Sequence, residues 1–218
     1  MTADFFGPKM VQKQEGRALK MIRFARESDV EAMLAIYAPY VLETTVTFEY
    51  VPPAKEEFLQ RFQEITQKLP WLVWEEEGVV LGYAYASLPF ERAAYAWCAE
   101  PSIYLRRDAR GRGAGKRLYA VLENLLQAMG YVVSFAIITG ENAPSLAFHR
   151  ANGYVPCGKM IKCGQKFGRW LDVCWLEKRL NSVEIPRNPP VAWREFRENR
   201  QKISDILGKM SLSEMQKI

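Results

Sequence analysis

The residues best suited to chemistry lie between positions 100 and 116, where glycines and arginines alternate. In order they are Arg110, Gly111, Arg112, Gly113 and Gly115. A run of β-forming residues ends at Leu105, and a helical apolar pattern begins after Lys116. A strand, a glycine-rich loop and a helix in this order direct backbone N–H groups at a phosphate, and the arginines add positive charge. The stretch therefore predicts a phosphate-binding loop, with a glycine-rich surface turn as the alternative.

Two common phosphate-binding patterns do not fit this loop. A P-loop needs G-x-x-x-x-G-K-[ST], but Arg110 occupies the first glycine position and Arg117 follows Lys116. The dinucleotide-binding fingerprint needs G-x-G-x-x-G, whereas the three glycines here are spaced G-x-G-x-G. The pattern that remains is R-x-x-G-x-G, from Arg110 to Gly115.

The composition is that of a globular protein with one sizeable core. The chain has 218 residues and a mass of 25.1 kDa, with 49% hydrophobic and 25% charged residues. It contains neither a run of about 18 apolar residues nor a signal peptide, so we expect a cytoplasmic protein without a membrane span. Four cysteines without a C-x-x-C pair and one histidine predict reduced thiols and no metal site.

The net charge of +5 does not predict nucleic-acid binding, because the charge is not concentrated. Residues 1–20 carry four basic and two acidic side chains, and residues 181–218 carry seven and five. The remaining 19 basic and 18 acidic residues give 21–180 a charge of only +1. A nucleic-acid-binding protein is expected to gather its positive charge on one face or in one run.

The spacing of apolar residues predicts helices and strands throughout 21–180. Strands are expected at 21–25, 71–76, 79–87, 93–105, 132–139, 154–163 and 169–180. Helices are expected from a capping box at Ser28 to Glu43, and at 55–68, 113–129 and 142–153. After a proline-containing linker, an apolar stripe over 191–207 predicts one amphipathic helix, docked on the core or on a partner chain rather than on a membrane.

Five further segments carry a family resemblance. They are Y-V-x-x-T-x-x-T-F-E (40–49), Y-A-Y-A-S (83–87), R-x-A-Y-x-W-x-x-E-x-S-I-Y (92–104), N-x-P-S-x-x-F-H-x-x-x-G-Y (142–154) and G-x-W-x-D-V (168–173). With the R-x-x-G-x-G loop and the order of the elements, they make the chain resemble the GNAT superfamily of N-acetyltransferases. Within that superfamily the segments are most similar to the phosphinothricin and methionine sulfone or sulfoximine N-acetyltransferases.

The resemblance implies an α/β (α+β) fold over 21–180. Its centre would be a mixed, mostly antiparallel twisted sheet of six to seven strands, flanked by about four helices. An N-terminal arm (1–20) and a C-terminal linker with an amphipathic helix (181–218) would complete the chain.

The resemblance also implies acetyl-CoA as the co-substrate, bound without a metal. The residues expected to bind it are Ile103, Tyr104, Leu105, Arg110, Gly111, Arg112, Gly113, Ala114, Gly115, Lys116, Asn142 and Ser145. A backbone N–H of Ile103 or Leu105 is expected to serve the thioester carbonyl. Asn142 also fits a plain helix cap, so its contact with acetyl-CoA stays open.

Two residues are expected to be catalytic. Glu100 lies where the resemblance implies the base that takes a proton from the substrate ammonium. The alternative is an exposed glutamate at a strand end. His149 lies where many GNAT enzymes have a tyrosine that protonates the leaving thiolate. An imidazole with a near-neutral pKa can donate such a proton, but His149 also fits a histidine that only packs on its helix and contacts the cofactor.

The amine substrate is expected to be a small amino acid or an analogue of one. The residues expected to line its pocket are Thr45, Phe48, Tyr85, Phe90 and Arg92. Arg92 is the candidate for binding the α-carboxylate, because a guanidinium binds a carboxylate with two hydrogen bonds; the alternative is a solvated loop charge. The threonine-rich segment 44–49 is either a pocket wall or a loop held against the core.

Other functions stay open at this stage. The enzyme could acetylate another amine, such as an aminoglycoside or a protein N-terminus, or the chain could be a non-catalytic acyl-CoA-binding module. Trp170 lies in a hairpin that often reaches the neighbouring subunit in such enzymes, so the resemblance implies a homodimer with a shared site.

Overall fold

The computed structural model describes residues 20–182 and 188–207. The predicted N-terminal arm up to residue 19, part of the linker (183–187) and residues 208–218 lie outside the described residues. The strands are β1 (Lys20–Phe24), β2 (Trp71–Glu76), β3 (Val79–Ser87), β4 (Cys98–Leu105), β5 (Val133–Thr139), β6 (Val155–Lys166) and β7 (Arg169–Arg179). The α-helices are α1 (Val30–Glu43), α2 (Lys55–Lys68), α3 (Ala114–Met129), α4 (Ala143–Ala151), α5 (Trp193–Phe196) and α6 (Arg200–Leu207).

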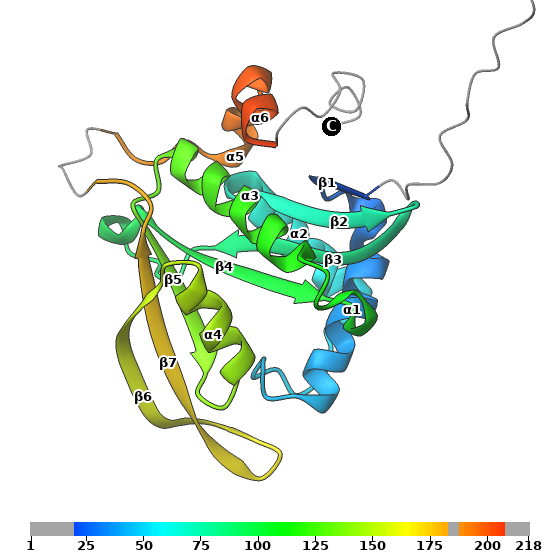
Figure 1. The fold of residues 1–218 in the computed structure, drawn as a ribbon, viewed down its shortest axis with the longest axis vertical. Helices are drawn as coiled ribbons and strands as arrows, with labels where there is room; N and C mark the ends of the chain where they lie inside the picture. The colour runs from blue at the N-terminus through cyan, green and yellow to red at the C-terminus, as the bar shows by residue number, and fades with distance from the viewer. Residues whose placement is uncertain (1–19, 183–187, 208–218) are drawn as a thin grey trace, which may run out of the picture.

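Within the described residues the strands form one seven-stranded sheet in the order β1-β2-β3-β4-β5-β7-β6. Neighbouring strands are antiparallel except for β4 and β5, which are parallel. Figure 1 shows α3 and α4 in front of the sheet, with α2 behind it and α1 along one side. The predicted mixed, mostly antiparallel α/β fold is therefore confirmed.

The two faces of the sheet have separate hydrophobic cores, because successive side chains of a strand point to opposite faces. On one face, Tyr83 of β3 and Tyr104 of β4 pack with α1 and α2. On the other, Ala84, Ala86 and Ala99 pack beneath α3. Small residues on this second face let α3 lie close to the strands, whereas aromatic rings fill the first face.

Strands β4 and β5 pair only at their beginnings, through Cys98↔Val133 and Ala99↔Ser134. Beyond these residues β4 continues beside β3, and β5 continues beside β7. The sheet therefore opens between β4 and β5 from Glu100 onward, and among the described residues no strand pairs with the edge of β4 on that side.

Four predictions of local structure were wrong in detail. The strand expected at 93–105 begins only at Cys98, because residues 93–95 form a 3-10 turn. The capping box expected at Ser28 is absent; instead the Asp29 carboxylate accepts from the backbone N–H of Arg26 at 2.8 Å. β6 runs three residues further than its predicted end at residue 163 and reaches a tight turn at residues 167 and 168.

The fourth wrong prediction concerns the single helix expected over 191–207, which is broken into α5 and α6 at residues 197–199. These two helices dock on the core, where α5 contacts α2 and α6 contacts α3 (Figure 1). The ring of Trp193 lies 4.6 Å from that of Phe24, and Phe196 and Ile203 are buried beside it. Among the helices of the described residues, none is long and apolar enough to cross a membrane.

The docked extension predicts a measurable contribution to stability. Trp193→Ala removes a side chain that is 4% exposed and leaves a cavity against Phe24, so we expect the free energy of unfolding to fall by about 3 kcal/mol or more. Arg194→Ala changes an exposed residue of the same short helix and should cost less than about 0.5 kcal/mol. Chemical denaturation measures both, and equal effects of the two changes would contradict the docking.

Candidate active site

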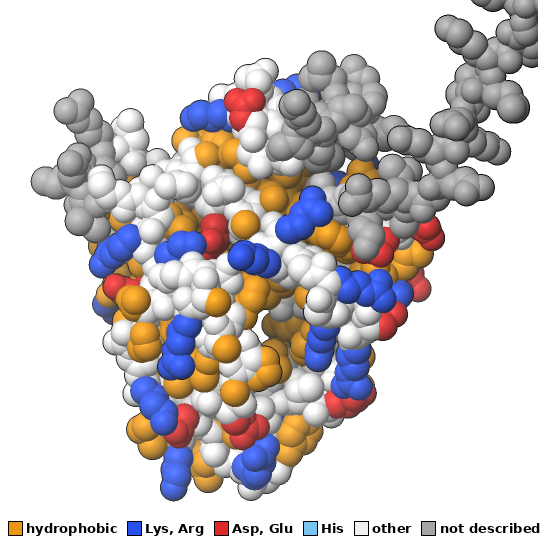
Figure 2. Space-filling view, in the orientation of Figure 1, with side chains coloured by type: hydrophobic (Ala, Val, Ile, Leu, Met, Phe, Trp, Pro, Cys, Tyr) orange, Lys and Arg blue, Asp and Glu red, His pale blue; other side chains and the backbone are white. Residues whose placement is uncertain are grey.

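The opening between β4 and β5 contains a cavity, which we call the β4–β5 cavity. Its lining residues are Val46, Glu100, Pro101, Ser102, Ile103, Tyr104, Ala136, Ile137, Ile138, Asn142, Ser145 and His149. Figure 2 shows a hollow between α4 and the N-terminal end of α3, with hydrophobic side chains around its mouth and Lys and Arg side chains along its margin. Six residues predicted for catalysis or cofactor binding thus come together at one place: Glu100, Ile103, Tyr104, Asn142, Ser145 and His149.

Glu100 is the acidic side chain among the residues that line the cavity. Its neighbour Ala99 packs under α3, so Glu100 points to the opposite face, beside Ser87 and Tyr85 of β3. Burial raises the pKa of the Glu100 carboxyl from 4.5 to about 7. A carboxyl with this pKa is partly ionised at neutral pH and is suited to accept a proton from an ammonium and release it again.

The unpaired edge of β4 offers a backbone donor to the cavity. The N–H of Arg106 bonds to Leu81 of β3, and N–H directions alternate along a strand. The N–H groups of Ile103 and Leu105 therefore point away from β3, toward the opening. Leu105 N–H already donates to the Tyr40 hydroxyl at 3.1 Å, which leaves Ile103 N–H as the free donor of the two that were predicted.

The glycine loop reaches α3 through left-handed backbone conformations. Gly111 has φ 76° and Gly113 has φ 78°, values that suit glycine and are costly for other residues. Gly113 is the N-cap of α3, so the free N–H groups of the first turn of the helix follow directly after the loop. Arg110 lies over the Tyr40 ring at 5.1 Å, and Arg112 is exposed. Free N–H groups and arginines at a helix N-terminus suit a pyrophosphate.

Gly115 is required for a different reason, because α3 passes close to β4 at this residue. A Cβ at Gly115 would lie 3.2 Å from Leu105 Cδ1 and 3.6 Å from Ile103 Cδ1. Ala114 is buried beside it, and Lys116 is exposed. The glycine thus holds the N-terminus of α3 against the unpaired edge of β4, so that the loop and the edge can contact one ligand.

Helix α4 forms the opposite wall of the cavity. Asn142 is its N-cap, and Asn142 Oδ1 accepts from the backbone N–H of Ser145 at 3.2 Å. This bond confirms the predicted cap, and Asn142 also lines the cavity. Ser145 and His149 follow on the same side of the helix, since residues four apart share one face.

Both ring nitrogens of His149 have partners inside the protein. Nδ1 lies 2.8 Å from the backbone oxygen of Ser145, and Nε2 lies 2.9 Å from the Tyr119 hydroxyl. His149 is 4% exposed, and burial lowers its pKa below 6.5. Because a carbonyl can only accept, Nδ1 carries the proton in the neutral ring. His149 is therefore an uncharged imidazole at neutral pH rather than an imidazolium acid.

Two of the predicted substrate-binding residues lie on the Glu100 face of the sheet. Tyr85 stacks on Trp71, with ring centroids 4.1 Å apart, and lies directly opposite Ser102 of β4. Phe90 packs against Trp175 of β7 and Phe135 of β5, at 6.0 and 5.9 Å. These rings form an apolar surface on both sides of the opening, although neither predicted residue lines the β4–β5 cavity itself.

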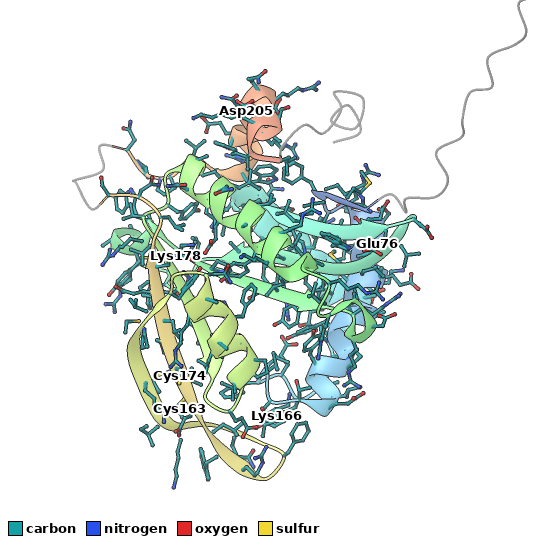
Figure 3. The ribbon with its side chains drawn as sticks, in the orientation of Figure 1. Glu76, Cys163, Lys166, Cys174, Lys178 and Asp205 are labelled. Carbon is teal, nitrogen blue, oxygen red and sulfur yellow. The ribbon has the colours of Figure 1, made fainter. Side chains whose placement is uncertain are left out.

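Two other predicted substrate-binding residues, Thr45 and Phe48, lie in the threonine-rich segment 44–49, which contacts the β6–β7 hairpin. Thr45 Oγ1 donates to Glu141 at 2.7 Å, and the ring of Phe48 lies so close to Gly164 that a Cβ there would come within 2.1 Å of it. Lys166, labelled in Figure 3 between the hairpin and this segment, donates to the backbone oxygen of Thr47 at 2.7 Å. Only Val46 of this segment is among the cavity-lining residues.

Arg92 is exposed in the loop between β3 and β4, and its backbone oxygen accepts from Tyr95. No contact of its guanidinium ties it to another described side chain, so the structure leaves it available to a ligand.

Several cavity-lining residues were not found from the sequence. Val46 and Ser102 carried no signal that separated them from their neighbours. Ala136 and Ile138 were recognised only as part of a buried strand, although their period of two would have placed them on one face. Tyr119, which contacts His149 but does not line the cavity, lies in a helical apolar pattern that does not distinguish it from a core residue.

A second groove, beside Tyr40 and Leu105 at the end of β4, is a poorer candidate for catalysis. Its carboxylates are Glu43 and Asp108, and each is already paired with an arginine, Arg107 and Arg106 respectively. Asp108 is exposed, and its bond to Arg106 lowers the pKa of its carboxyl, so Asp108 is poorly suited to accept a proton at neutral pH.

Comparisons with known proteins agree with this geometry. Residues 22–175 match the family model described as an acetyltransferase (GNAT) domain. A phosphinothricin N-acetyltransferase of Alcaligenes faecalis is 36% identical over 177 residues, which cover 80% of this chain and 90% of the relative. An L-methionine sulfoximine/L-methionine sulfone acetyltransferase of Pseudomonas aeruginosa is 37% identical over 164 residues, 73% of this chain and 94% of the relative.

A crystal structure of a GNAT superfamily phosphinothricin acetyltransferase from Sinorhizobium meliloti, in complex with AcCoA, superposes with a TM-score of 0.73. It is 38% identical and covers 78% of this chain and 92% of that one. The chain therefore belongs to the GNAT acetyltransferase family. It is an acetyl-CoA-dependent N-acetyltransferase, close to the phosphinothricin and methionine sulfoximine acetyltransferases. The left-handed glycine loop suits the pyrophosphate of acetyl-CoA, and the free Ile103 N–H suits a carbonyl oxygen of the same molecule.

The raised pKa of Glu100 predicts a pH-dependent stability. A carboxyl whose pKa rises on folding stabilises the protein below its unfolded pKa of 4.5, and this stability is lost as the pH rises to about 7. Glu100→Gln removes the loss, so the variant should become more stable than the unaltered chain by about 1–3 kcal/mol above pH 7 and gain nothing near pH 4. Thermal unfolding from pH 4 to 8 measures this difference. Glu56→Gln, on the exposed side of α2, is the control, and identical pH profiles for both variants would refute the buried charge.

Proposed function

We propose that this enzyme transfers acetyl to the α-amine of a small amino acid or analogue, with Glu100 as the base. The observation that carries this proposal is the position of Glu100, a carboxyl of pKa about 7 at the point where β4 leaves β5. Bound acetyl-CoA supplies a thioester carbonyl beside the edge of β4. Glu100 takes the proton of the ammonium, directly or through water, and thereby produces the free amine that attacks.

Ile103 N–H is the donor that we assign to the carbonyl oxygen. Charge that develops on this oxygen is stabilised by a donor that is fixed before the reaction begins. The rigidity comes from the β3–β4 ladder on the other side of the strand, where Ala84 lies opposite Ile103. The glycine loop and α3 hold the pyrophosphate at the end of the same strand, so one element aligns both ends of the cofactor.

The substrate side chain would lie on the apolar surface formed by Tyr85, Phe90 and the rings beside it. Arg92, two residues after Phe90, would bind the α-carboxylate from its exposed loop. The relatives named for phosphinothricin and for methionine sulfoximine or sulfone make these three amino-acid analogues the leading candidates. Each combines an α-amino acid with a compact polar end group. We expect the threonine-rich segment, through Thr45 and Phe48, to contact that group.

We also propose a homodimer in a reducing, cytoplasmic setting. The exposed residues of the β6–β7 hairpin include several large apolar ones: Val155, Met160, Ile161, Phe167 and Trp170. β6 is an edge strand of the sheet, and such edges pair readily with another strand. All four cysteines are free thiols, as is usual in reducing compartments; recovery of the protein outside the cytoplasmic fraction of its cells would refute this setting.

The first test is thiol release from acetyl-CoA with a panel of amines. The panel contains L-phosphinothricin, L-methionine sulfone, L-methionine sulfoximine, the common L-amino acids, their decarboxylated amines and one aminoglycoside. We expect turnover of the first three and little of the decarboxylated amines, which cannot use Arg92. Glu100→Gln should lower kcat by about 100-fold or more while leaving the Kd of acetyl-CoA nearly unchanged. Turnover of the aminoglycoside alone, or an active Glu100→Gln variant, would overturn the proposal.

The dimer is tested by mass in solution. Sedimentation equilibrium should give twice the chain mass, and Trp170→Asp should shift it toward that of one chain, because a buried charge without a partner is costly at an interface. Glu177→Gln, on the same strand but half-buried within the sheet, is the control. A single-chain mass for the unaltered protein would refute the dimer.

A further inference from the structure

The threonine-rich segment contributes one residue, Val46, to the wall of the β4–β5 cavity, which Glu100 and His149 also line. The segment follows α1 and forms neither helix nor strand, so no regular ladder of backbone hydrogen bonds fixes it. A wall that is loose in the free enzyme must be ordered each time a substrate binds, and this ordering weakens binding. The contacts that fix the segment therefore affect the site.

Side chains from two strands hold the backbone on both sides of Val46. Thr139 Oγ1, at the end of β5, donates to the backbone oxygen of Thr45 at 2.5 Å. Lys166 Nζ, at the end of β6, donates to the backbone oxygen of Thr47 at 2.7 Å (Figure 3). The carbonyl groups immediately before and after Val46 are thus both bonded to residues that lie far away in the sequence.

Lys166 is a buried cation without a carboxylate partner. It is 1% exposed, and no ion pair among the described residues includes it. Burial lowers the pKa of its ammonium below 10.5, although the charge of Glu49 acts in the opposite direction. A buried ammonium is costly unless it is hydrogen-bonded, and a methionine would fill the same space without this cost. Besides its contact with the Phe167 ring, the bond to Thr47 is what the charge of Lys166 provides.

Further contacts join the threonine-rich segment and the residue after it to the same hairpin. Phe48 packs against Gly164, where a Cβ would come within 2.1 Å of its ring. The Tyr50 hydroxyl donates to the backbone oxygen of Gln165 at 2.6 Å. The position of Val46 is therefore set by the ends of β5 and β6 and not by its neighbours in the sequence alone.

We propose that Lys166 and Thr139 are positioning residues for acetyl transfer, which hold Val46 in the cavity wall and so define the space that the amine occupies beside Glu100. This inference rests on the proposed function, because it concerns how the same site binds its amine. Neither Lys166 nor Thr139 lines the cavity, and each acts through the backbone of the threonine-rich segment. Acetyl-CoA depends on the edge of β4 and on the glycine loop instead, so the two substrates respond differently when either bond is lost.

The kinetic test removes each bond with little change of shape. Lys166→Met keeps the length of the side chain without the donor, and Thr139→Val keeps the branched shape without the hydroxyl. Each change should raise the KM of the amine about ten-fold, because the amine then has to order the wall as it binds. The kcat and the KM of acetyl-CoA should change less than about two-fold. The amine is the member of the panel that the unaltered enzyme acetylates fastest.

Two control variants and a double variant complete the kinetic test. Thr139→Ser keeps the hydroxyl and should keep the amine KM of the unaltered enzyme, and Lys162→Met, at an exposed position of β6, should change none of the constants. Lys166→Met with Thr139→Val should raise the amine KM by less than the product of the single increases, since both bonds hold one segment. An unaltered amine KM in both single variants, a full product, or a Thr139→Ser variant as impaired as Thr139→Val would overturn the proposal.

The second test does not depend on turnover. Hydrogen exchange is measured by mass spectrometry on the free enzyme, in a peptide that contains residues 44–49. The N–H groups of Val46 and Glu49 donate to the hydroxyls of Thr44 and Thr47, and they should exchange faster when the segment is loosened. We expect faster exchange in Lys166→Met and Thr139→Val and an unaltered rate in Thr139→Ser.

The two tests distinguish failure of this inference from failure of the proposed function. Unaltered exchange in Lys166→Met and Thr139→Val, in an enzyme that acetylates its amine, overturns the inference alone. Absence of turnover by the unaltered enzyme with every amine refutes the proposed function, and this inference with it, whatever the exchange rates are.

Discussion

The divergence of β4 from β5 after Ala99 is the constraint on which the site depends. A buried backbone N–H or C=O must find a partner, and along most of the sheet that partner is the next strand. From Glu100 onward, no strand in the described part of the chain pairs with β4 on one side. Tyr40 therefore occupies both backbone groups of Leu105, and Ile103 N–H stays free for a ligand. The cavity, the cofactor edge and the position of Glu100 all follow from these missing ladder bonds.

The alternation of side chains along the strands separates Glu100 from the buried His149. Glu100 and Tyr85 face the α1/α2 layer, whereas Ser134 and Ala136 face α3 and α4. An opening through the sheet is the one place where groups from both layers can meet the same reacting atoms. The enzyme can therefore hold a carboxyl of raised pKa and an uncharged histidine close to one cavity without a direct contact between them.

Most of the fold could be predicted because its signals are local. The glycines of the loop, the Asn142 cap and the apolar spacing of α3 each depend on a few neighbouring residues, and the structure confirms them. The predictions failed where contacts between residues far apart in the sequence determine the local structure. Residues 93–97 have the composition of a strand but form a turn, in which the ring of Tyr95 packs against that of Phe90. The capping box expected at Ser28 does not form, because the Asp29 carboxylate accepts from the backbone N–H of Arg26 instead. The same carboxylate is also held by Arg23 from β1.

The sequence by itself determined the order of the elements, the glycine loop and the identity of the side chains that can carry a proton. The tertiary structure decided what those side chains can do. Burial at the β4–β5 opening moves the pKa of Glu100 to about 7, and burial lowers the pKa of His149, although its hydrogen bond to the backbone of Ser145 acts in the opposite direction. Residue type sets the ordinary pKa, but desolvation and hydrogen bonds from residues far apart in the chain set the actual one, and these exist only once the chain has folded.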